Sequence, residues 1–157
     1  MREKDYAVHL NPVWRGRANF IINAEIEDLD YRPLRFEQLW AHRISESCFE
    51  VCCIPFFVYD LALGDRVEAR PHDHVVSRVV ERSGHYTFQA WFGDADHPDS
   101  RDDVLTAIED LGCEFEWYSR NLLGIDARDD ELAQDVADYL SDQQSRQALT
   151  YETGRTG

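Results

Sequence analysis

Residues 52–67 form the feature that most constrains the fold of this chain. They contain the densest apolar run in the sequence, residues 54–59, which Pro55 interrupts. A proline lacks a backbone donor and fixes φ, so it bends or ends a strand. Gly64 and Asp65 then supply a tight turn. We therefore expect an extended segment that enters the core, bends at the proline, crosses under the fold and leaves by a turn.

The rest of the first half alternates apolar and polar residues with a period of two, which is typical of half-buried antiparallel strands. The predicted strands are 6–10, 20–26, 36–44, 49–53 and 66–70. They are short and separated by polar turns. Residues 1–71 are therefore predicted to form a small curled antiparallel sheet or a small barrel.

The second half has a different pattern. Residues 75–81 and 86–92 are predicted strands, joined by Ser83-Gly84 in a hairpin. A helix is expected from an N-cap at Ser100 to Gly112, and a second one after Asp129 or Asp130. Strands are expected at 113–117 and 148–152, with 122–125 ambiguous. This order predicts that residues 72–157 form a ferredoxin-like layer with two helices on one face, which makes the chain an α+β protein.

The composition is that of an ordinary folded protein. No apolar stretch approaches the ~20 residues that a membrane span needs, and the N-terminus lacks the layout of a signal peptide. Four cysteines are too few for a secreted disulfide scaffold and favour buried, reduced thiols. We expect a cytoplasmic protein that is a monomer or a small oligomer.

The negative charge is concentrated in the second half. Residues 94–142 contain sixteen acidic residues and three arginines, whereas the rest of the chain is nearly balanced. Such a field opposes nucleic acids and anionic membranes and favours a basic protein partner. A solvated surface or a salt-adapted host is the alternative interpretation. The candidate partner-binding residues are Asp102, Asp103, Glu109, Asp110, Glu114, Glu116, Asp129, Asp130 and Glu131.

A search for catalytic signatures identifies no catalytic residue, no cofactor motif and no metal site. Phosphate loops, dinucleotide fingerprints, nucleophile elbows and His-Glu-x-x-His are absent from the sequence. Cys48 and Cys52 lie about 13 Å apart on a strand, too far to share a zinc ion. The pairs His72 and His74, and Ser83 and His85, are interpreted as strand-entry and turn residues.

Aromatic residues offer one further candidate site. Most aromatic side chains at strand periods belong to the core. A ligand pocket between the two layers is nevertheless a common arrangement. If one exists, it is predicted to lie near Cys53, Tyr59, His85 and Trp91.

Three segments resemble a bacterial family known as domain of unknown function 4265. They are Ile-Pro-Phe-Phe-Val-Tyr at 54–59 followed by Gly64-Asp65-x-Val67, then Ser83-Gly84-His85-x-Thr87, and the upstream Glu37-x-Leu39-Trp40. The resemblance extends over about residues 6–152. This sequence has Cys53 where the family usually has an asparagine. The resemblance brings no activity and no catalytic residues with it.

Two functions are compatible with these patterns. The favoured one is a non-enzymatic acidic binding protein, with an immunity protein that neutralises a basic toxin as its concrete form. The alternative is a small-ligand sensor or enzyme with a pocket between the two layers. Mimicry of nucleic acid by the acidic face is a third interpretation, which differs from the first only in its partner.

Overall fold

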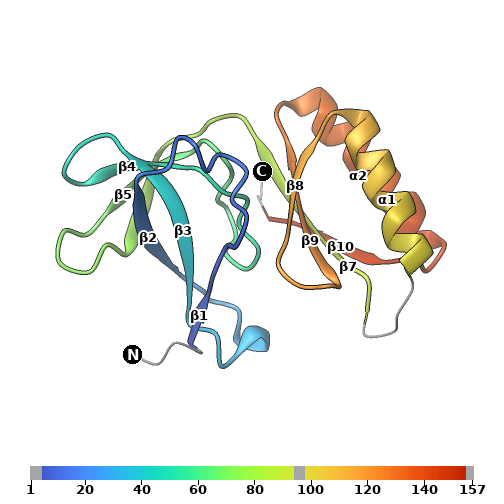
Figure 1. Ribbon diagram of the computed structural model, residues 1–157, viewed down its shortest axis with the longest axis horizontal. Helices are drawn as coiled ribbons and strands as arrows, with labels where there is room; N and C mark the ends of the chain where they lie inside the picture. Colours follow the sequence, from blue (N-terminus) through green and yellow to red (C-terminus); the bar gives the residue numbers. More distant parts are fainter. Residues whose placement is uncertain (1–4, 94–97, 155–157) are drawn as a thin grey trace.

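The computed structural model describes residues 5–93 and 98–154 and shows two units side by side (Figure 1). The N-terminal unit is a six-stranded sheet, and the C-terminal unit is a four-stranded sheet with two helices. The N-terminal strands are β1 (Tyr6–Ala7), β2 (Phe20–Glu25), β3 (Phe36–Arg43), β4 (Cys48–Val51), β5 (Arg66–Ala69) and β6 (Val76–Glu81). The C-terminal elements are β7 (Tyr86–Trp91), α1 (Pro98–Leu111), β8 (Glu114–Trp117), β9 (Leu122–Ala127), α2 (Asp130–Ser145) and β10 (Thr150–Thr153).

The N-terminal sheet is curled but forms no closed barrel within the described residues. Strands β2, β3, β4, β5 and β6 pair in antiparallel fashion, whereas the short β1 runs parallel to β3. The sheet is therefore mixed, not antiparallel throughout as predicted. Its two edges, β2 and β6, meet at one isolated bridge between Asn23 and Val75. Two register shifts between β5 and β6 increase the local twist that brings these edges together.

The C-terminal sheet is antiparallel, with the strand order β10-β7-β9-β8. Both helices cover the face turned away from the N-terminal unit (Figure 1). Val104 and Ile108 of α1 and Val136 and Leu140 of α2 are fully buried against this face. Asp129 caps α2 as predicted, because its carboxylate accepts a hydrogen bond from the Leu132 N–H.

The hairpin predicted at the junction is wrong. Strands β6 and β7 do not form a hairpin, because β6 belongs to the N-terminal sheet and β7 to the C-terminal one. The chain changes sheets between Glu81 and Tyr86, whereas the predicted boundary lies at 71–72. Helix α1 also begins at Pro98, two residues before the predicted cap at Ser100. The apolar alternation of residues 75–81 carries no information about which sheet the strand joins.

Residues 52–65 cross between the two units without forming a strand, and most of them are buried. Ile54 and Phe56 lie against Gly124 of β9, where an added Cβ would come within 3.1 Å of either side chain. The segment leaves by the predicted turn at Gly64, whose φ of +84° favours glycine. Asp65 holds this turn by accepting hydrogen bonds from the Ala62 and Ser83 N–H groups.

Candidate functional site

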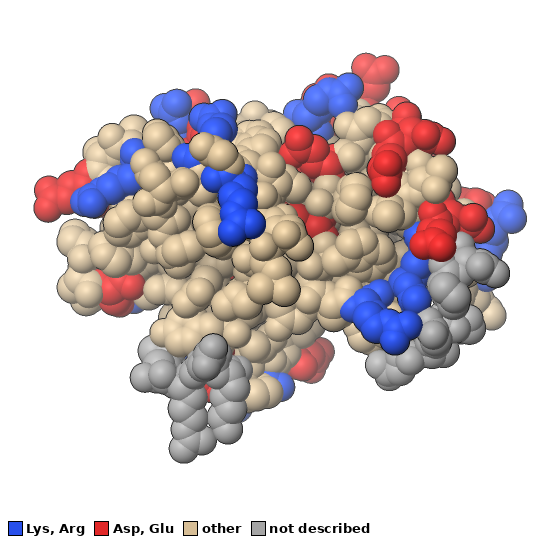
Figure 2. Space-filling view, in the orientation of Figure 1, with Lys and Arg blue, Asp and Glu red and all other residues tan. Residues whose placement is uncertain are grey.

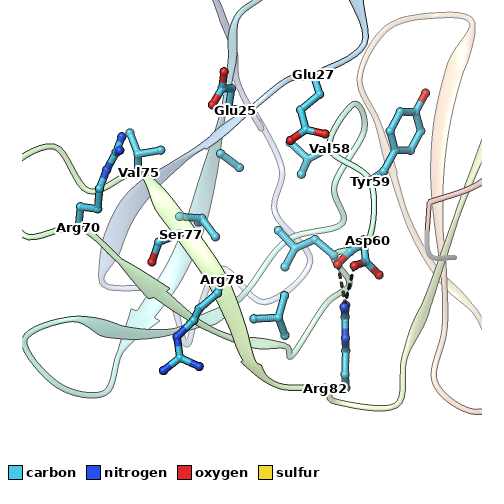
Figure 3. A pocket seen from close by; sticks show the side chains of 14 residues that line it. Glu25, Glu27, Val58, Tyr59, Asp60, Arg70, Val75, Ser77, Arg78 and Arg82 are labelled. Atoms are coloured by element: carbon cyan, nitrogen blue, oxygen red, sulfur yellow. Dashed lines mark hydrogen bonds and ion pairs between the residues drawn. The ribbon is translucent and has the colours of Figure 1, made fainter. Parts of the chain in front are cut away.

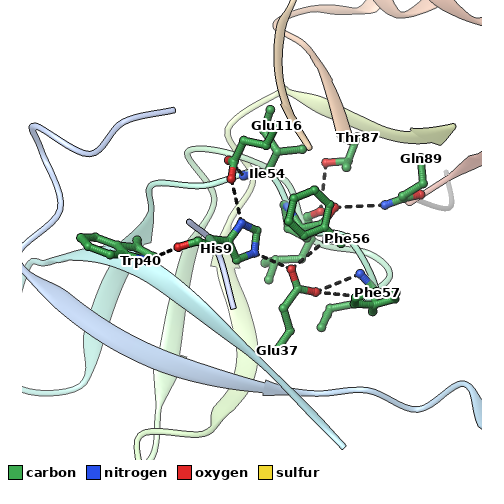
Figure 4. Close-up of polar contacts among 12 residues, drawn as sticks. His9, Glu37, Trp40, Ile54, Phe56, Phe57, Thr87, Gln89 and Glu116 are labelled. Carbon is green, nitrogen blue, oxygen red and sulfur yellow. Dashed lines mark hydrogen bonds and ion pairs between the residues drawn. The ribbon is translucent and has the colours of Figure 1, made fainter. Parts of the chain in front are cut away.

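The polar centre of the molecule is His9, which lies between two buried carboxylates (Figure 4). Its Nε2 lies 2.6 Å from Oε2 of Glu37, and its Nδ1 lies 2.8 Å from Oε1 of Glu116. The side chains of His9 and Glu37 are fully inaccessible to solvent, and that of Glu116 is nearly so. A histidine donates from both nitrogens only as an imidazolium. We call His9, Glu37 and Glu116 the ion cluster.

Glu37 serves as a hydrogen-bond acceptor for residues 52–65, which form no strand and which we call the crossing segment. It lies on the inward face of β3, in line with Leu39 and Ala41. Its Oε2 accepts from the Phe56 N–H at 2.8 Å, and its Oε1 accepts from Phe57 and Val58 at 2.9 and 3.1 Å. Buried N–H groups need partners. One carboxylate thus replaces the strand ladder that Pro55 excludes.

Glu116 plays the same part from the other unit. It lies on the face of β8 opposite the helices, and its Oε2 accepts from the Ile54 N–H at 2.6 Å. A longer contact of 3.4 Å joins the same oxygen to the Val13 N–H. The two carboxylates therefore hold the crossing segment from opposite sides. The ion cluster ties the two units together through this segment.

The pKa of His9 lies well above that of an ordinary histidine. Burial alone would lower it, but the contacts with Cys53, Glu116 and Glu37 outweigh that effect. Burial raises the pKa of the Cys53 thiol, which favours the neutral, unreactive form. A buried imidazolium between two carboxylates, closed to solvent, has no access to a substrate. The arrangement acts as a structural ion cluster.

The raised pKa of His9 makes stability depend on pH. Its stabilisation is complete below about pH 6.5, the value for an unfolded histidine, and is lost as the pH rises through the folded pKa. We expect the free energy of unfolding to fall between pH 6.5 and 8.5, by at most about 1.4 kcal/mol per pH unit for this one group. Urea unfolding across this range measures the slope.

Three variants identify the source of the slope. His85 also has a raised pKa, because its Nδ1 donates a hydrogen bond to the Asp126 carboxylate at 2.7 Å. Replacement of His85 is therefore expected to remove only the part of the slope that His85 causes. His9→Gln is expected to remove most of the remaining dependence of the unfolding free energy on pH. The exposed His72→Gln is the matched control and should leave it unchanged. An unfolding profile that stays steep in His9→Gln would contradict this assignment.

A cleft with a volume of about 590 Å³ opens on the helix-free face of the C-terminal sheet. Its lining includes Tyr31, Phe57, Gln89, Trp91, Tyr118 and Glu152. Phe57 packs edge-on against Tyr31 and Tyr118, with ring centroids 4.8 and 4.7 Å apart. Trp91 is 41% exposed, although it is large and apolar. The cleft is thus aromatic, and both units contribute to it.

A cluster of hydroxyls and carboxylates borders this cleft. The Tyr59 hydroxyl lies 3.1 Å from Asp28 and 3.1 Å from Glu152, and 3.4 Å from the hydroxyl of Tyr31. Burial and the neighbouring carboxylates raise the pKa of Tyr59. The pKa of Tyr31 is raised by burial and by Glu152 and Asp28, although its contact with Tyr59 lowers it. Burial is the main cause of both shifts, and the two carboxylates add to it.

A second cavity, of about 820 Å³, lies where the curled sheet does not close (Figure 3). It is bordered by β2, β6 and the end of the crossing segment. Its arginines are already paired with carboxylates. Arg82 contacts Asp60 at 2.8 Å, and Arg78 contacts Glu68 at 3.2 Å. Its arginines therefore present little free positive charge to a ligand, whereas the carboxylates of Glu25 and Glu27 also line the cavity (Figure 3).

The four predicted pocket residues do not share one cavity. Trp91 lines the aromatic cleft, whose described lining does not include the other three. Tyr59 lies in the rim cluster and lines a neighbouring hollow with Tyr151 and Glu152. Cys53 is fully buried beside His9, and His85 pairs with Asp126. Sequence patterns missed His9, Glu37 and Gln89, because a polar residue facing inward resembles one that faces solvent.

The predicted partner-binding residues lie mainly over the helices and their ends, except Glu114 and Glu116, which lie on β8. Figure 2 shows acidic side chains gathered over α1 and α2, with a few arginines among them, and mostly basic ones on the visible face of the N-terminal unit. The exposed members are Asp102, Asp103, Glu109, Asp110, Glu114, Asp129, Asp130 and Glu131. Glu116 is buried in the ion cluster, so its assignment to a partner surface is wrong.

Within residues 5–93 and 98–154, no group of three or more histidine, cysteine, aspartate or glutamate side chains has the geometry of a metal site. The cysteines in this part of the chain are free thiols. The described helices include none that is long and apolar enough to cross a membrane. These findings provide no site for a metal cofactor among the described residues.

Comparison with known proteins identifies the family. The sequence profile of the domain of unknown function DUF4265 matches residues 37–151. The chain belongs to the DUF4265 family. A solved structure of a hypothetical protein from Neisseria gonorrhoeae is similar in fold, with a TM-score of 0.73 and 22% sequence identity over 87% of this chain and 94% of that one. No curated protein matches the chain.

The motifs that suggested DUF4265 have physical roles in this structure. Glu37 accepts the backbone donors of the crossing segment, and Trp40 donates from Nε1 to the His9 carbonyl at 3.2 Å. Gly64 and Asp65 form the turn that ends this segment. Cys53, which lies next to the matched Ile-Pro-Phe-Phe segment, is beside the His9 ring. The motifs of this DUF4265 protein therefore build the junction of its two units.

Proposed function

We propose that this protein is a cytoplasmic, non-enzymatic binding protein that captures a basic protein partner, as an immunity protein captures a toxin. The observation that carries the proposal is the exposure of seven predicted carboxylates on the two helices or at their ends, with an eighth, Glu114, on β8. Three further exposed acids, Asp135, Asp138 and Asp142, extend the surface along α2. We also propose that the C-terminal unit is a ferredoxin-like layer, whose sheet presents the two helices together.

Three features support electrostatic capture. The two helices, which carry most of these carboxylates, cover the face of the C-terminal sheet turned away from the N-terminal unit (Figure 1). Among the arginines of this unit, Arg146 is already paired with Asp142 at 3.0 Å. A surface of one sign steers an oppositely charged partner and accelerates association at low salt. We take the assembly to be one copy of the chain with one partner.

Charge reversal on α1 tests the proposal. Glu109→Lys with Asp110→Lys places two cations at the C-terminal end of the helix, where the helix dipole favours positive charge, so folding is preserved. The association rate with a basic protein encoded beside this gene should fall about tenfold at low salt. Biolayer interferometry at several salt concentrations measures the rate and its salt dependence.

Glu27→Lys with Glu46→Lys is the matched control, because both residues are exposed on the N-terminal unit and the net charge change is equal. This control should bind nearly as fast as the native protein. Equal losses in both double variants would show that only total charge matters. The absence of binding to every neighbouring basic gene product would refute the proposal.

The aromatic cleft supports a second candidate function, the binding of a small ligand by a sensor or an enzyme. Its position between the two units and its partly exposed Trp91 favour this function. A thermal-shift screen with a metabolite library is the test. A compound that raises the midpoint of thermal unfolding of the native protein, but not that of the Trp91→Ala variant, would support the cleft as a binding site. A flat screen would count against it.

A further inference from the structure

We infer that the aromatic cleft recognises a guanidinium group. This inference names the ligand class for the second candidate function and rests on it. The contributing residues are Trp91, Gln89 and Glu152 in the lining and the Tyr59–Asp28 pair at its rim.

The first argument is an unused acceptor. Gln89 is 94% buried and lines the cleft. Its Nε2 donates to the Pro55 carbonyl at 3.2 Å, but its Oε1 accepts no hydrogen bond from the described residues (Figure 4). A buried acceptor without a donor is costly. This oxygen is closed to solvent, so a ligand with N–H donors would satisfy it once the Gln89 side chain turns toward the cleft.

The second argument concerns the number of protons at the rim. Oδ2 of Asp28 and Oε2 of Glu152 both lie 3.1 Å from the Tyr59 hydroxyl. That hydroxyl has one proton and so can donate to only one of the two carboxylates. The hydroxyl of Tyr31 lies 3.4 Å from that of Tyr59. The rim therefore has more negative acceptors than donors, which favours a cationic donor.

The third argument is the shape and charge of the walls. Faces of Trp, Tyr and Phe attract cations, and arginine stacks on such rings more readily than lysine does. The described lining contains Glu152 but no lysine, arginine or histidine. A flat cation with several N–H donors matches the aromatic walls, the Gln89 oxygen and the Glu152 carboxylate together. A guanidinium has this chemistry, whereas a quaternary ammonium lacks the donors.

The test uses agmatine, a small guanidinium compound, and N-carbamoylputrescine, in which a neutral urea replaces the guanidinium and the amine is kept. Agmatine should shift the NMR signals of the Trp91 indole and the Gln89 side-chain amide, and the urea analogue should not. Glu152→Gln should lower the affinity for agmatine about tenfold or more, and Trp91→Ala should lower it about 3- to 30-fold. Glu27→Gln, an exposed carboxylate at another site, should leave the affinity unchanged.

Two further ligands separate the possible outcomes. Acetyl-Gly-Arg-Gly-amide tests whether the guanidinium comes from a protein. If this peptide binds as tightly as agmatine, the natural ligand is an arginine side chain. If only agmatine binds, the natural ligand is a free metabolite. Indole tests the cleft itself. Indole binding without agmatine binding overturns the guanidinium inference and leaves the second candidate function standing. If neither binds, both fail. Agmatine affinity that survives Glu152→Gln also overturns the inference.

Discussion

Glu37→Gln is expected to lower the free energy of unfolding by about 3–5 kcal/mol, the usual cost of removing one partner of a buried ion pair. The amide is nearly isosteric, so the loss does not arise from packing. The carboxylate accepts hydrogen bonds from His9, Phe56, Phe57 and Val58. In the variant an NH₂ group, itself a donor, replaces one of the accepting oxygens and would point at these N–H donors. Urea unfolding at pH 7 measures the loss.

Glu25→Gln is the matched control, since Glu25 lies on the neighbouring strand β2 and is exposed. Its unfolding free energy should stay within about 0.5 kcal/mol of the native value. The Glu37→Gln variant should also show larger changes in backbone amide chemical shift at residues 54–58 than elsewhere. A loss below 1 kcal/mol would mean that the carboxylate is not essential to the crossing segment.

Phe56→Ala is expected to cost about 3–5 kcal/mol, because it empties a large volume at the contact of the two units. Phe56 is 2% exposed and stacks on the His9 ring, with centroids 4.5 Å apart. Its other edge lies against Gly124, whose missing side chain leaves room for the ring. The loss of the ring also exposes the ion cluster to water.

Phe56→Leu should retain part of this stability, since it fills much of the same volume. Phe36→Ala is the control for an aromatic residue outside the contact, because Phe36 is half-buried and stacks on Tyr6 near the edge of the sheet. Thermal and urea unfolding should rank the three variants, with Phe56→Ala the least stable. Equal losses for Phe56→Ala and Phe36→Ala would contradict the special role of the contact.

The sequence predicts individual elements well, because period two, helical spacing and caps are local signals. The Asp129 cap and the turn at Gly64 are confirmed for this reason. Sheet membership depends on distant pairing, so β6 was placed with the wrong sheet. The parallel β1 could not be predicted either, because two residues are too few to carry a pattern.

The candidate sites were harder to predict than the fold. In residues 6–10 the apolar Val8 and Leu10 are exposed, whereas His9 is buried. A period-two pattern separates two sets of residues, and the apolar set is normally assigned to the core. This assignment fails when the buried set contains a charged residue. Glu37 gave one signal, its place in the segment that resembles DUF4265, but no sequence pattern linked it to His9 or to Glu116, 79 residues later. Such links appear only once both sheets are in place.

The long separation within the ion cluster has a consequence for synthesis on the ribosome. His9 and Glu116 are 107 residues apart in the chain, so about 5–20 s pass between their translation in bacteria. During that interval the nascent chain has Glu37 but lacks the second carboxylate, and the Ile54 amide has no acceptor from β8. The N-terminal sheet is therefore expected to emerge as an incomplete intermediate, which closes only after most of the polypeptide has been made.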